Sequence, residues 1–469
     1  MVLLAFVIRV HWNLVAHPIG EFMYSDMKGY NSRANAVLSK PWEAKEYTAF
    51  FPFGTTWLLA AIKALFGTEN FTAIGITYAA LGAAIVGNMM ATAGRLAHGK
   101  WLPIAVGGIL AIYYPLIAIG GYILSEIPFS FFLTSCVYLL VRLHDEGRER
   151  DAWAIGVCAG LGACVRPQLL MSVALFGLFW LIARKHMPKI TWLMLGRVAL
   201  PLLIILGISA TRFHWHTGRL GLVSENGTIN QIFGHCHNKG IYARPSETHS
   251  GTIRFAPPPL IQLEAHTALN PDSWIRLDPV FADHPEPVEW LDGFAIDEFG
   301  CGKRTCRIRG GEIEYRGYIG DQKLQKRLVR ECIKRSGLKK QAYFSFVHIV
   351  QLWGYNSMWP DQADPKPRPK DAVQSWRALA EFWRRVQVFV FCGPALLGLV
   401  FVFRPQRDPR RSMVALQLLS LLVVAALYIG GIRFRVPYDP IIVLLACMSI
   451  ESALVFVLSR GRPSTPTAA

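Results

Sequence analysis

Long apolar runs recur along the chain, separated by short polar connections. Each has roughly 15 to 24 residues, and a helix of about 20 apolar residues crosses a ~30 Å hydrocarbon core. The runs cover 2–15, 71–94, 101–119, 122–141, 151–165, 168–183, 193–211, 386–403, 412–430 and 438–458. The pattern predicts an all-α polytopic membrane protein with about ten transmembrane helices.

The first run is unusual for a membrane span. It starts almost at Met1, contains Arg9, and has neither the basic leader nor the small-residue cleavage site of a signal peptide. We expect either a chain that begins further upstream or a first helix that is tilted and frayed.

Lysine and arginine gather in alternate connections. The basic connections are 95–100, 142–150, 184–192, 404–411 and the tail from Arg460, and the intervening ones at about 120, 166 and 430–437 are very short or carry isolated arginines. Because basic residues in short loops stay on the cytoplasmic side, the former set is predicted to be cytoplasmic. The net charge of +17 follows partly from these loops, which face anionic lipid.

The segment 51–67, FPFGTTWLLAAIKALFG, resembles a span, but counting it as one would reverse the side of every later loop. It is therefore predicted to be an amphipathic helix in the outer interface of the first outer loop. Lys63 is expected to reach lipid headgroups from it.

Three regions are predicted. Residues 1–211 form an N-terminal transmembrane bundle with a first extracytoplasmic loop at 16–70; residues 212–385 form an extracytoplasmic domain; residues 386–469 hold the C-terminal transmembrane helices and a short cytoplasmic tail. The middle region carries weak strand signals (GTIRFA, EIEYRGYIG), Pro-rich passages and a basic amphipathic helix at 321–342, so we expect a mixed, irregular fold.

Cysteines in the middle region are candidates for disulfides. Of nine cysteines, Cys236, Cys301, Cys306 and Cys332 fall there. An even set in an oxidising compartment is compatible with disulfides, and three pairings stay open.

Two acids and three arginines lie at span ends predicted to face the outer side: Asp26, Glu126, Arg166, Arg433 and Arg435. Charged groups near a bilayer are costly, so they mark function or pair with one another. A carboxylate beside the interface would act as a base or hold a divalent cation, and guanidinium binds phosphate through paired hydrogen bonds. The alternatives are a helix cap or solvated loop for the acids and snorkelling to headgroups for the arginines.

Signals for metal, nucleotide and nucleic-acid binding are weak or missing in the sequence. The pairs His214/His216 and His235/His237 could bind metal, although no third ligand is fixed by spacing. GxGxxG and Walker sequences are lacking, which argues against a nucleotide-driven pump. The basic residues form no aromatic-interleaved stripe, so nucleic acid is not an expected partner.

The order of these features resembles the GT-C glycosyltransferases that use polyprenyl-phosphate sugars, in the branch of protein O-mannosyltransferases and lipid A aminoarabinose transferase (glycosyltransferase family 39-like). The matching pieces are SDMKGY, FFPFGTTWLLAAIKALFG, the Pro115–Glu126 element ending in LSE, ACVRPQLL and RFRVPYDPIIVLLA. Many members have a second acid in the first loop, whereas Met27 follows Asp26 here.

The resemblance implies inverting transfer of a sugar from a polyprenyl-phosphate donor to a hydroxyl or amine of a glycan, lipid or protein acceptor. Asp26 would be the base, or the ligand if a divalent cation is used, and Glu126 would orient the acceptor or the arginines. Arg433 or Arg435, with Arg166, would hold the donor phosphate. Tyr30, Asn226 and Asn230 are candidate substrate contacts. The expected location is a bacterial inner (plasma) membrane, with the active site on the periplasmic face.

Two other classes remain as alternatives. An O-antigen polymerase or ligase also has many spans and a large outer loop with arginines. A transporter or flippase for lipid-linked glycans also needs interior charges, but such proteins often show repeated halves, and no internal repeat is evident here. Neither the sugar nor the acceptor is fixed by the sequence.

Overall fold

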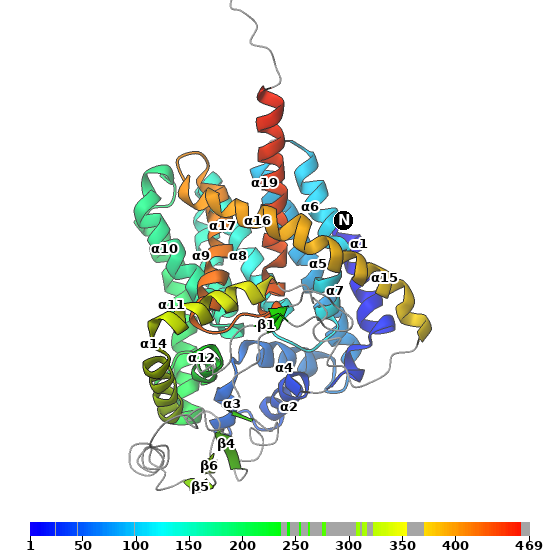
Figure 1. Cartoon of the computed structure of the whole chain (residues 1–469). Helices are drawn as coiled ribbons and strands as arrows, with labels where there is room; N and C mark the ends of the chain where they lie inside the picture. Colours follow the sequence, from blue (N-terminus) through cyan, green and yellow to red (C-terminus); the bar gives the residue numbers. More distant parts are fainter. Residues whose placement is uncertain are drawn as a thin grey trace, which may run out of the picture.

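The computed structural model describes residues 1–23, 25–44, 46–97, 99–235, 322–353 and 370–460, together with six short strands between 242 and 316. Long helices run side by side through most of the molecule (Figure 1). Among the described residues, six helices are long and apolar enough to cross a membrane. They are α5 (Phe71–Leu96), α8 (Glu126–Glu146), α10 (Leu169–Ala183) with η3 (Arg184–His186), α11 (Trp192–Thr217), α17 (Pro409–Leu427), and α18 (Ile432–Arg435) with η8 (Val436–Tyr438) and α19 (Asp439–Arg460).

The remaining apolar runs are helical but shorter or broken. Helices α6 (Trp101–Ala111) and α7 (Tyr114–Gly120) meet at a 47° bend and count as a seventh span if taken together. The others are α1 (Val2–His11) with η1 (Trp12–Ala16), α9 (Glu149–Val165), and the series η6 (Gln387–Cys392), α16 (Gly393–Leu397), η7 (Gly398–Phe403). The predicted class, an all-α polytopic membrane protein, is confirmed. The predicted number of about ten spans is higher than found: six helices, or seven with the bent pair, meet the length criterion among the described residues, and the runs 2–15, 151–165 and 386–403 form shorter helices.

Arg9 in the first helix supports the bend between α6 and α7. Pro115 lies at the start of α7 and disfavours a continuous helix, so the last carbonyls of α6 have no helical donors. The guanidinium of Arg9 supplies them, donating to the Leu110 carbonyl at 3.0 Å and the Ala111 carbonyl at 3.2 Å. Gly82 of α5 makes room, since a Cβ there would lie 2.6 Å from Cδ of Arg9. This intramembrane arginine is therefore structural.

Three helices of the first loop lie at the lower end of the long helices in Figure 1: α2 (Ser25–Ser39), α3 (Glu46–Phe50) and α4 (Gly54–Phe66). The 3-10 turn η2 (Ile19–Glu21) precedes them. Helix α4 falls inside the predicted segment 51–67 and is shorter than a span. The expectation that Lys63 reaches headgroups was wrong: it is buried, and its Nζ donates to Asn35 Oδ1 at 2.8 Å and to the Thr68 carbonyl at 2.6 Å. Lys63 thus joins α4 to α2.

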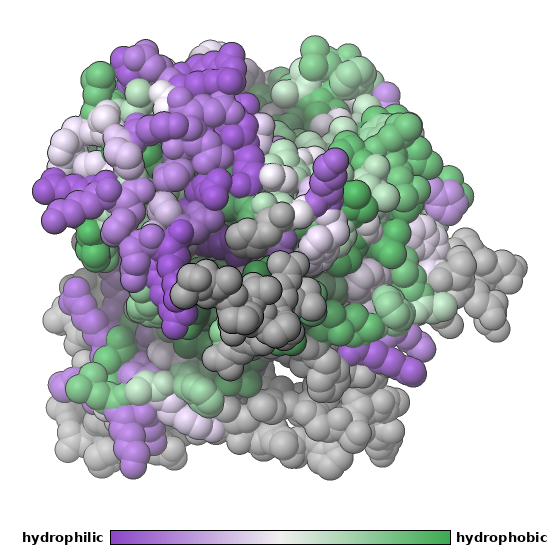
Figure 2. Space-filling view, turned by 90° about the horizontal axis from the view of Figure 1, so that it is seen from above, coloured by the Kyte–Doolittle hydropathy of each residue, from purple (hydrophilic) through white to green (hydrophobic). Residues whose placement is uncertain are grey.

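The basic connections meet at the opposite end. Arg95 lies 3.2 Å and Arg410 lies 3.5 Å from carboxylate oxygens of Asp145, and Lys189 donates to the Asp145 carbonyl. Seen from this end, hydrophilic side chains gather over one half of the surface (Figure 2). The loops 95–100, 142–150, 184–192 and 404–411, predicted to share a side, therefore share one end of the bundle.

The region 212–385 contains both predicted strand signals and the predicted basic helix. After α12 (Gly227–His235), strands β1 (Tyr242–Ala243) and β2 (Ile253–Arg254) pair antiparallel. Strands β3 (Ile261–Gln262), β4 (Trp274–Leu277), β5 (Cys306–Arg309) and β6 (Glu312–Arg316) form a second antiparallel sheet in the order β3-β4-β6-β5. Helix α14 (Gln322–Leu352), broken at Gly337, and α15 (Lys370–Val386) follow.

Two expectations for this region stay predictions. The side chains of Cys236, Cys301, Cys306 and Cys332 lie outside the described residues, as does His237. The boundaries of the three predicted regions are likewise untested.

Candidate active site

Four of the five predicted charged residues form one ion-pair cluster. Asp26 comes from the first turn of α2, Glu126 begins α8, Arg166 ends α9, and Arg433 lies in α18. Arg433 bridges the two acids, with Nη1 at 2.7 Å from Asp26 Oδ2 and Nε at 2.5 Å from Glu126 Oε1. Nη2 of Arg166 reaches the same Glu126 oxygen at 2.5 Å.

The cluster is buried at one end and accessible at the other. The side chain of Glu126 is 0% exposed, whereas those of Arg433 and Asp26 are 24% and 30% exposed. Two guanidinium groups and two carboxylates balance in charge, which limits the cost of burial. Glu126 is thus the buried carboxylate of the cluster, and Asp26 is the accessible one.

Arg166 retains hydrogen-bonding capacity beyond its ion pair. Its Nε donates to Ser125 Oγ at 2.8 Å, and its buried Nη1 has no acceptor in the part of the chain that the structure describes. Nε2 of Gln168, two residues further on, is also buried and without an acceptor there. Because a buried, unsatisfied donor is costly, these groups favour an anionic ligand.

Tight packing against α12 and α14 fixes the loop before Arg433. A Cβ on Gly430 would overlap the His348 carbonyl of α14, and one on Gly234 of α12 would overlap the Tyr428 carbonyl. The ring of His235 also lies 2.8 Å from the Leu427 carbonyl and 2.7 Å from Gln341 Oε1. The region 212–385 therefore helps to place Arg433.

Arg435 does not join the cluster. It is fully buried, its Nε lies 2.9 Å from Asp439 Oδ1, and its Nη1 donates to the Leu352 carbonyl at 2.8 Å. The Tyr113 hydroxyl donates to the other oxygen of Asp439 at 3.0 Å. Arg435 and Asp439 thus tie the end of α14 to the α6–α7 bend.

Of the tentative substrate contacts, Tyr30 lies beside the cluster. It is buried, and burial, then the charge of Asp26, raise its pKa, so its hydroxyl stays protonated at neutral pH. Asn226 contacts the end of α3, with its backbone N–H donating to the Phe50 carbonyl at 3.1 Å and its Oδ1 accepting from Ser224 at 2.9 Å. Asn230 continues the same turn, donating from its backbone to Asn226 at 3.3 Å.

A metal centre does not emerge among the described residues. No three His, Cys, Asp or Glu side chains converge there, and one oxygen of Asp26 is bound by Arg433. The His214 ring lies 3.3 Å from the Arg219 carbonyl, and the His235 ring hydrogen-bonds to Gln341 and to the Leu427 carbonyl. The residues near Asp26 therefore do not fit a multidentate cation site.

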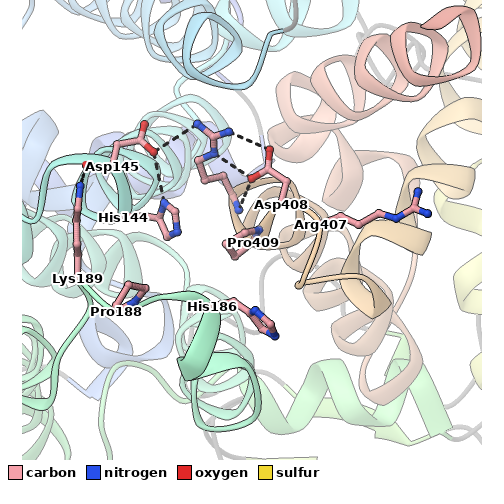
Figure 3. A pocket seen from close by; sticks show the side chains of 9 residues that line it. His144, Asp145, His186, Pro188, Lys189, Arg407, Asp408 and Pro409 are labelled. Atoms are coloured by element: carbon pink, nitrogen blue, oxygen red, sulfur yellow. Dashed lines mark hydrogen bonds and ion pairs between the residues drawn. The ribbon is translucent and has the colours of Figure 1, made fainter. Parts of the chain in front are cut away.

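A cavity of about 370 Å³ lies at the opposite end, between the loops that follow α8, η3 and η7. The Arg410 guanidinium donates to Asp408 Oδ1 at 2.9 Å and to Asp145 Oδ1 at 3.5 Å. Arg407 points away from Asp145 and Asp408 (Figure 3). Lys189 donates to the Asp145 backbone. These charges bind one another, so we interpret the cavity as the space between ion-paired loops.

Several residues of the site had no clear signal in the sequence. Ser125 and Gln168 are common polar residues, and Arg33 lies within a polar helix. Arg212 in ATRFHWH could have been found, because it ends a span on the same side as Asp26. Phe51 and Phe53, whose rings contact Arg33 and Arg212, belong to the FFPF motif at the start of the segment predicted to be interfacial.

Comparison with protein families matches residues 2–216 to the family described as dolichyl-phosphate-mannose-protein mannosyltransferase. The match includes Asp26, Glu126 and Arg166 and ends before Arg433. It confirms the resemblance to GT-C glycosyltransferases over this part of the chain. Comparison with curated protein sequences gives no match.

Solved structures similar to the chain include the oligosaccharyltransferase of Archaeoglobus fulgidus in the apo form, with a TM-score of 0.43 and 11% identity. The archaeal oligosaccharyltransferase AglB from Archaeoglobus fulgidus, in complex with an inhibitory peptide and a dolichol-phosphate, has a TM-score of 0.43 and 12% identity. Each is matched by 100% of this chain over 52% of its own length, so the chain spans about half of those proteins.

Proposed function

We propose that this protein is an integral membrane glycosyltransferase that transfers a sugar from a polyprenyl-phosphate donor to an acceptor hydroxyl or amine. The reaction takes place at the end of the bundle opposite the basic loops. The positive-inside rule assigns the basic loops to the cytoplasmic side, so this end faces the outer side. The family match over residues 2–216 supports a lipid-phosphate sugar as donor.

The observation that carries the proposal is the asymmetric cluster around Glu126. Its accessible end offers the carboxylate of Asp26 and the guanidinium of Arg433, and its buried end leaves an unsatisfied donor on Arg166. A sugar phosphate needs both: a base for the acceptor and cations for the phosphate.

Asp26 is the proposed base. In inverting transfer, the acceptor oxygen or nitrogen forms a bond to the anomeric carbon while its proton passes to a carboxylate. The bond between that carbon and the phosphate oxygen breaks, and its electron pair leaves with the polyprenyl phosphate. One carboxylate suffices, because phosphate leaves without a strong acid.

Arg433 and Arg166 are the proposed phosphate ligands. Charge grows on the phosphate as the glycosidic bond breaks, and fixed guanidinium donors stabilise that charge. Arg433 binds Asp26 at 2.7 Å in the structure, so a phosphate arriving at Arg433 competes with this carboxylate. Donor binding therefore loosens Asp26 from Arg433 and makes its oxygen available as a base.

Glu126 is the proposed positioning residue. It accepts from Arg166 and Arg433 at 2.5 Å each and is inaccessible, so it holds the two guanidinium groups side by side. It neither reaches the accessible surface nor needs to change its protonation. Arg435, fully buried against Asp439, is not part of the proposed phosphate site.

The experiment uses the purified full chain in lipid nanodiscs with radiolabelled polyprenyl-phosphate sugars and a panel of acceptors. We expect labelled product and free polyprenyl phosphate in equal amounts. Asp26→Asn should remove turnover, whereas Glu21→Gln, an exposed acid in the same loop, should not.

The products also separate the other classes. A polymerase or ligase would release a polyprenyl diphosphate from a diphosphate-linked glycan. A flippase would move the lipid between leaflets with its sugar bond intact. Either result, without cleavage of a monophosphate donor, would contradict the proposal.

A further inference from the structure

A second group of cations lies beside the ion-pair cluster. Arg33 of α2 is buried, with its guanidinium 4.3 Å from the ring centre of Phe51 and 4.9 Å from that of Tyr30. Arg212, near the end of α11, lies 4.5 Å from the ring centre of Phe53. Phe51 and Phe53 belong to the short segment between α3 and α4, so the two arginines stack along one stretch of chain.

The two guanidinium groups repel one another. Arg33 acts on Arg212 as a nearby like charge, which disfavours their approach in a poorly solvated place. Their aromatic contacts offset part of this cost and hold both groups flat and fixed. An anion bound by both guanidinium groups would weaken this repulsion further.

Arg212 also has an unsatisfied hydrogen-bond donor among the described residues. Its Nη2 donates to the Thr48 carbonyl at 2.7 Å, which fixes the direction of the side chain. Its Nη1 is buried and has no acceptor within the described parts of the chain. A phosphate or carboxylate oxygen would satisfy this group through a charge-assisted hydrogen bond.

Tyr30 connects this pair to the cluster. Its hydroxyl lies within electrostatic range of Asp26, Arg33 and Arg166, and Arg33 lies over its ring. An anion at Arg33 and Arg212 would bind other side chains than the proposed donor-phosphate ligands Arg166 and Arg433. It would still lie near Asp26, the proposed base.

We propose that Arg33 and Arg212 form a second anion subsite that binds a phosphate or carboxylate on the acceptor. The transferase would then act on anionic acceptors, with the negative group held by the two arginines and the accepting hydroxyl or amine presented to Asp26. This inference rests on the proposed function, since it names the acceptor class of the same site.

The test compares acceptors that differ only in charge: one alcohol in neutral, carboxylated and phosphorylated forms, each with the same labelled donor. We expect the anionic forms to have a KM at least about tenfold lower than that of the neutral form. One charge-assisted hydrogen bond strengthens binding by about this factor. Arg33→Gln and Arg212→Gln should each remove this preference while donor KM changes less than about twofold. Lys28→Gln, which removes an exposed positive charge from the same helix as Arg33, should leave it intact.

Hydrolysis of the donor by water, measured without acceptor, separates the two proposals. If wild type cleaves the donor neither with water nor with any acceptor, the proposed function fails. If wild type cleaves the donor and the variants hydrolyse it at the wild-type rate, the donor site of the variants is intact. The difference in KM between neutral and anionic acceptors then tests the subsite. Equal use of neutral and anionic acceptors, or a rise in donor KM in the variants, would overturn the subsite.

The lysine variants guard against misfolding. Arg33→Lys and Arg212→Lys retain the charge, so they should keep a measurable part of the anionic preference. If the glutamine variants are unstable, lysine variants that fold but treat all three acceptors alike would also contradict the proposal.

Discussion

Asp26 and Arg433 are joined by an ion pair of 2.7 Å between Oδ2 and Nη1, although one belongs to the first polar loop and the other to the start of the last membrane helix. The proposed base and a proposed phosphate ligand therefore neutralise each other before substrates bind. In the proposed mechanism, donor phosphate and Asp26 compete for the same guanidinium group, and this competition couples donor binding to activation of the base.

The first prediction follows from this competition. Asp26→Asn should lower turnover by at least about a hundredfold, as expected for loss of a general base, and should bind polyprenyl phosphate more tightly than wild type. The physical reason is that Arg433 no longer has a carboxylate partner in Asp26. Binding is measured with a fluorescent polyprenyl phosphate in nanodiscs. Weaker binding in the variant would contradict the exchange of partners at Arg433.

Glu126→Gln should destabilise the protein more than Asp26→Asn. Glu126 is 0% exposed and neutralises two guanidinium groups, whereas Asp26 is 30% exposed and pairs with one. Breaking a buried pair costs about 3–5 kcal/mol, and exposed pairs contribute about 0–1 kcal/mol. Thermal unfolding in detergent, followed by tryptophan fluorescence, gives the order of the two midpoints. The reverse order would remove Glu126 as the anchor.

Substitutions of Arg435 and Arg433 should have different effects on stability and on donor KM, although only one residue separates the two arginines. Arg435→Gln should lower thermal stability, because it breaks the bonds to Asp439 and to the Leu352 carbonyl, and any protein that folds should keep the wild-type donor KM. Arg433→Gln should raise donor KM by about tenfold or more through loss of a phosphate contact. Parallel kinetics of the two variants test this, and a larger donor effect at Arg435 would reverse the assignment.

Gly430→Ala should impair catalysis from outside the cluster. A Cβ there overlaps the His348 carbonyl, so the loop must move and carry Arg433 with it. We expect kcat to fall by about tenfold or more, since small misplacements of catalytic groups are costly. Gly227→Ala, with open space around its Cβ, is the control and should retain activity.

The contact between Arg9 and Gly82 should matter for folding only. Gly82→Ala brings a Cβ to 2.6 Å from Arg9 Cδ and should cost about 1–3 kcal/mol, as overpacking does. Gly94→Ala in the same helix meets nothing within 4 Å and should be neutral or slightly stabilising. Thermal unfolding compares the two, and equal midpoints would show that Arg9 does not rely on this space.

The sequence by itself determined the membrane helices and which loops share an end. Run length and basic residues are local properties, so α5, α8, α10, α11, α17 and α19 were found where the apolar runs lie. The same pattern kept 51–67 from being counted as a span, and this placed Asp26, Glu126, Arg166 and Arg433 on one side. The two strand signals and the basic helix before residue 342 were also predicted correctly.

Only the tertiary structure decided which charge pairs with which. Arg433 meets Glu126 across 307 positions of chain, while Arg435 meets Asp439 four residues away, and the two arginines share one helical turn. Lys63 binds Asn35 of α2, and Arg9 donates to the Leu110 carbonyl at the bend between α6 and α7. Such partners depend on how the helices pack together and not on the spacing within any of them, so a single sequence cannot assign them.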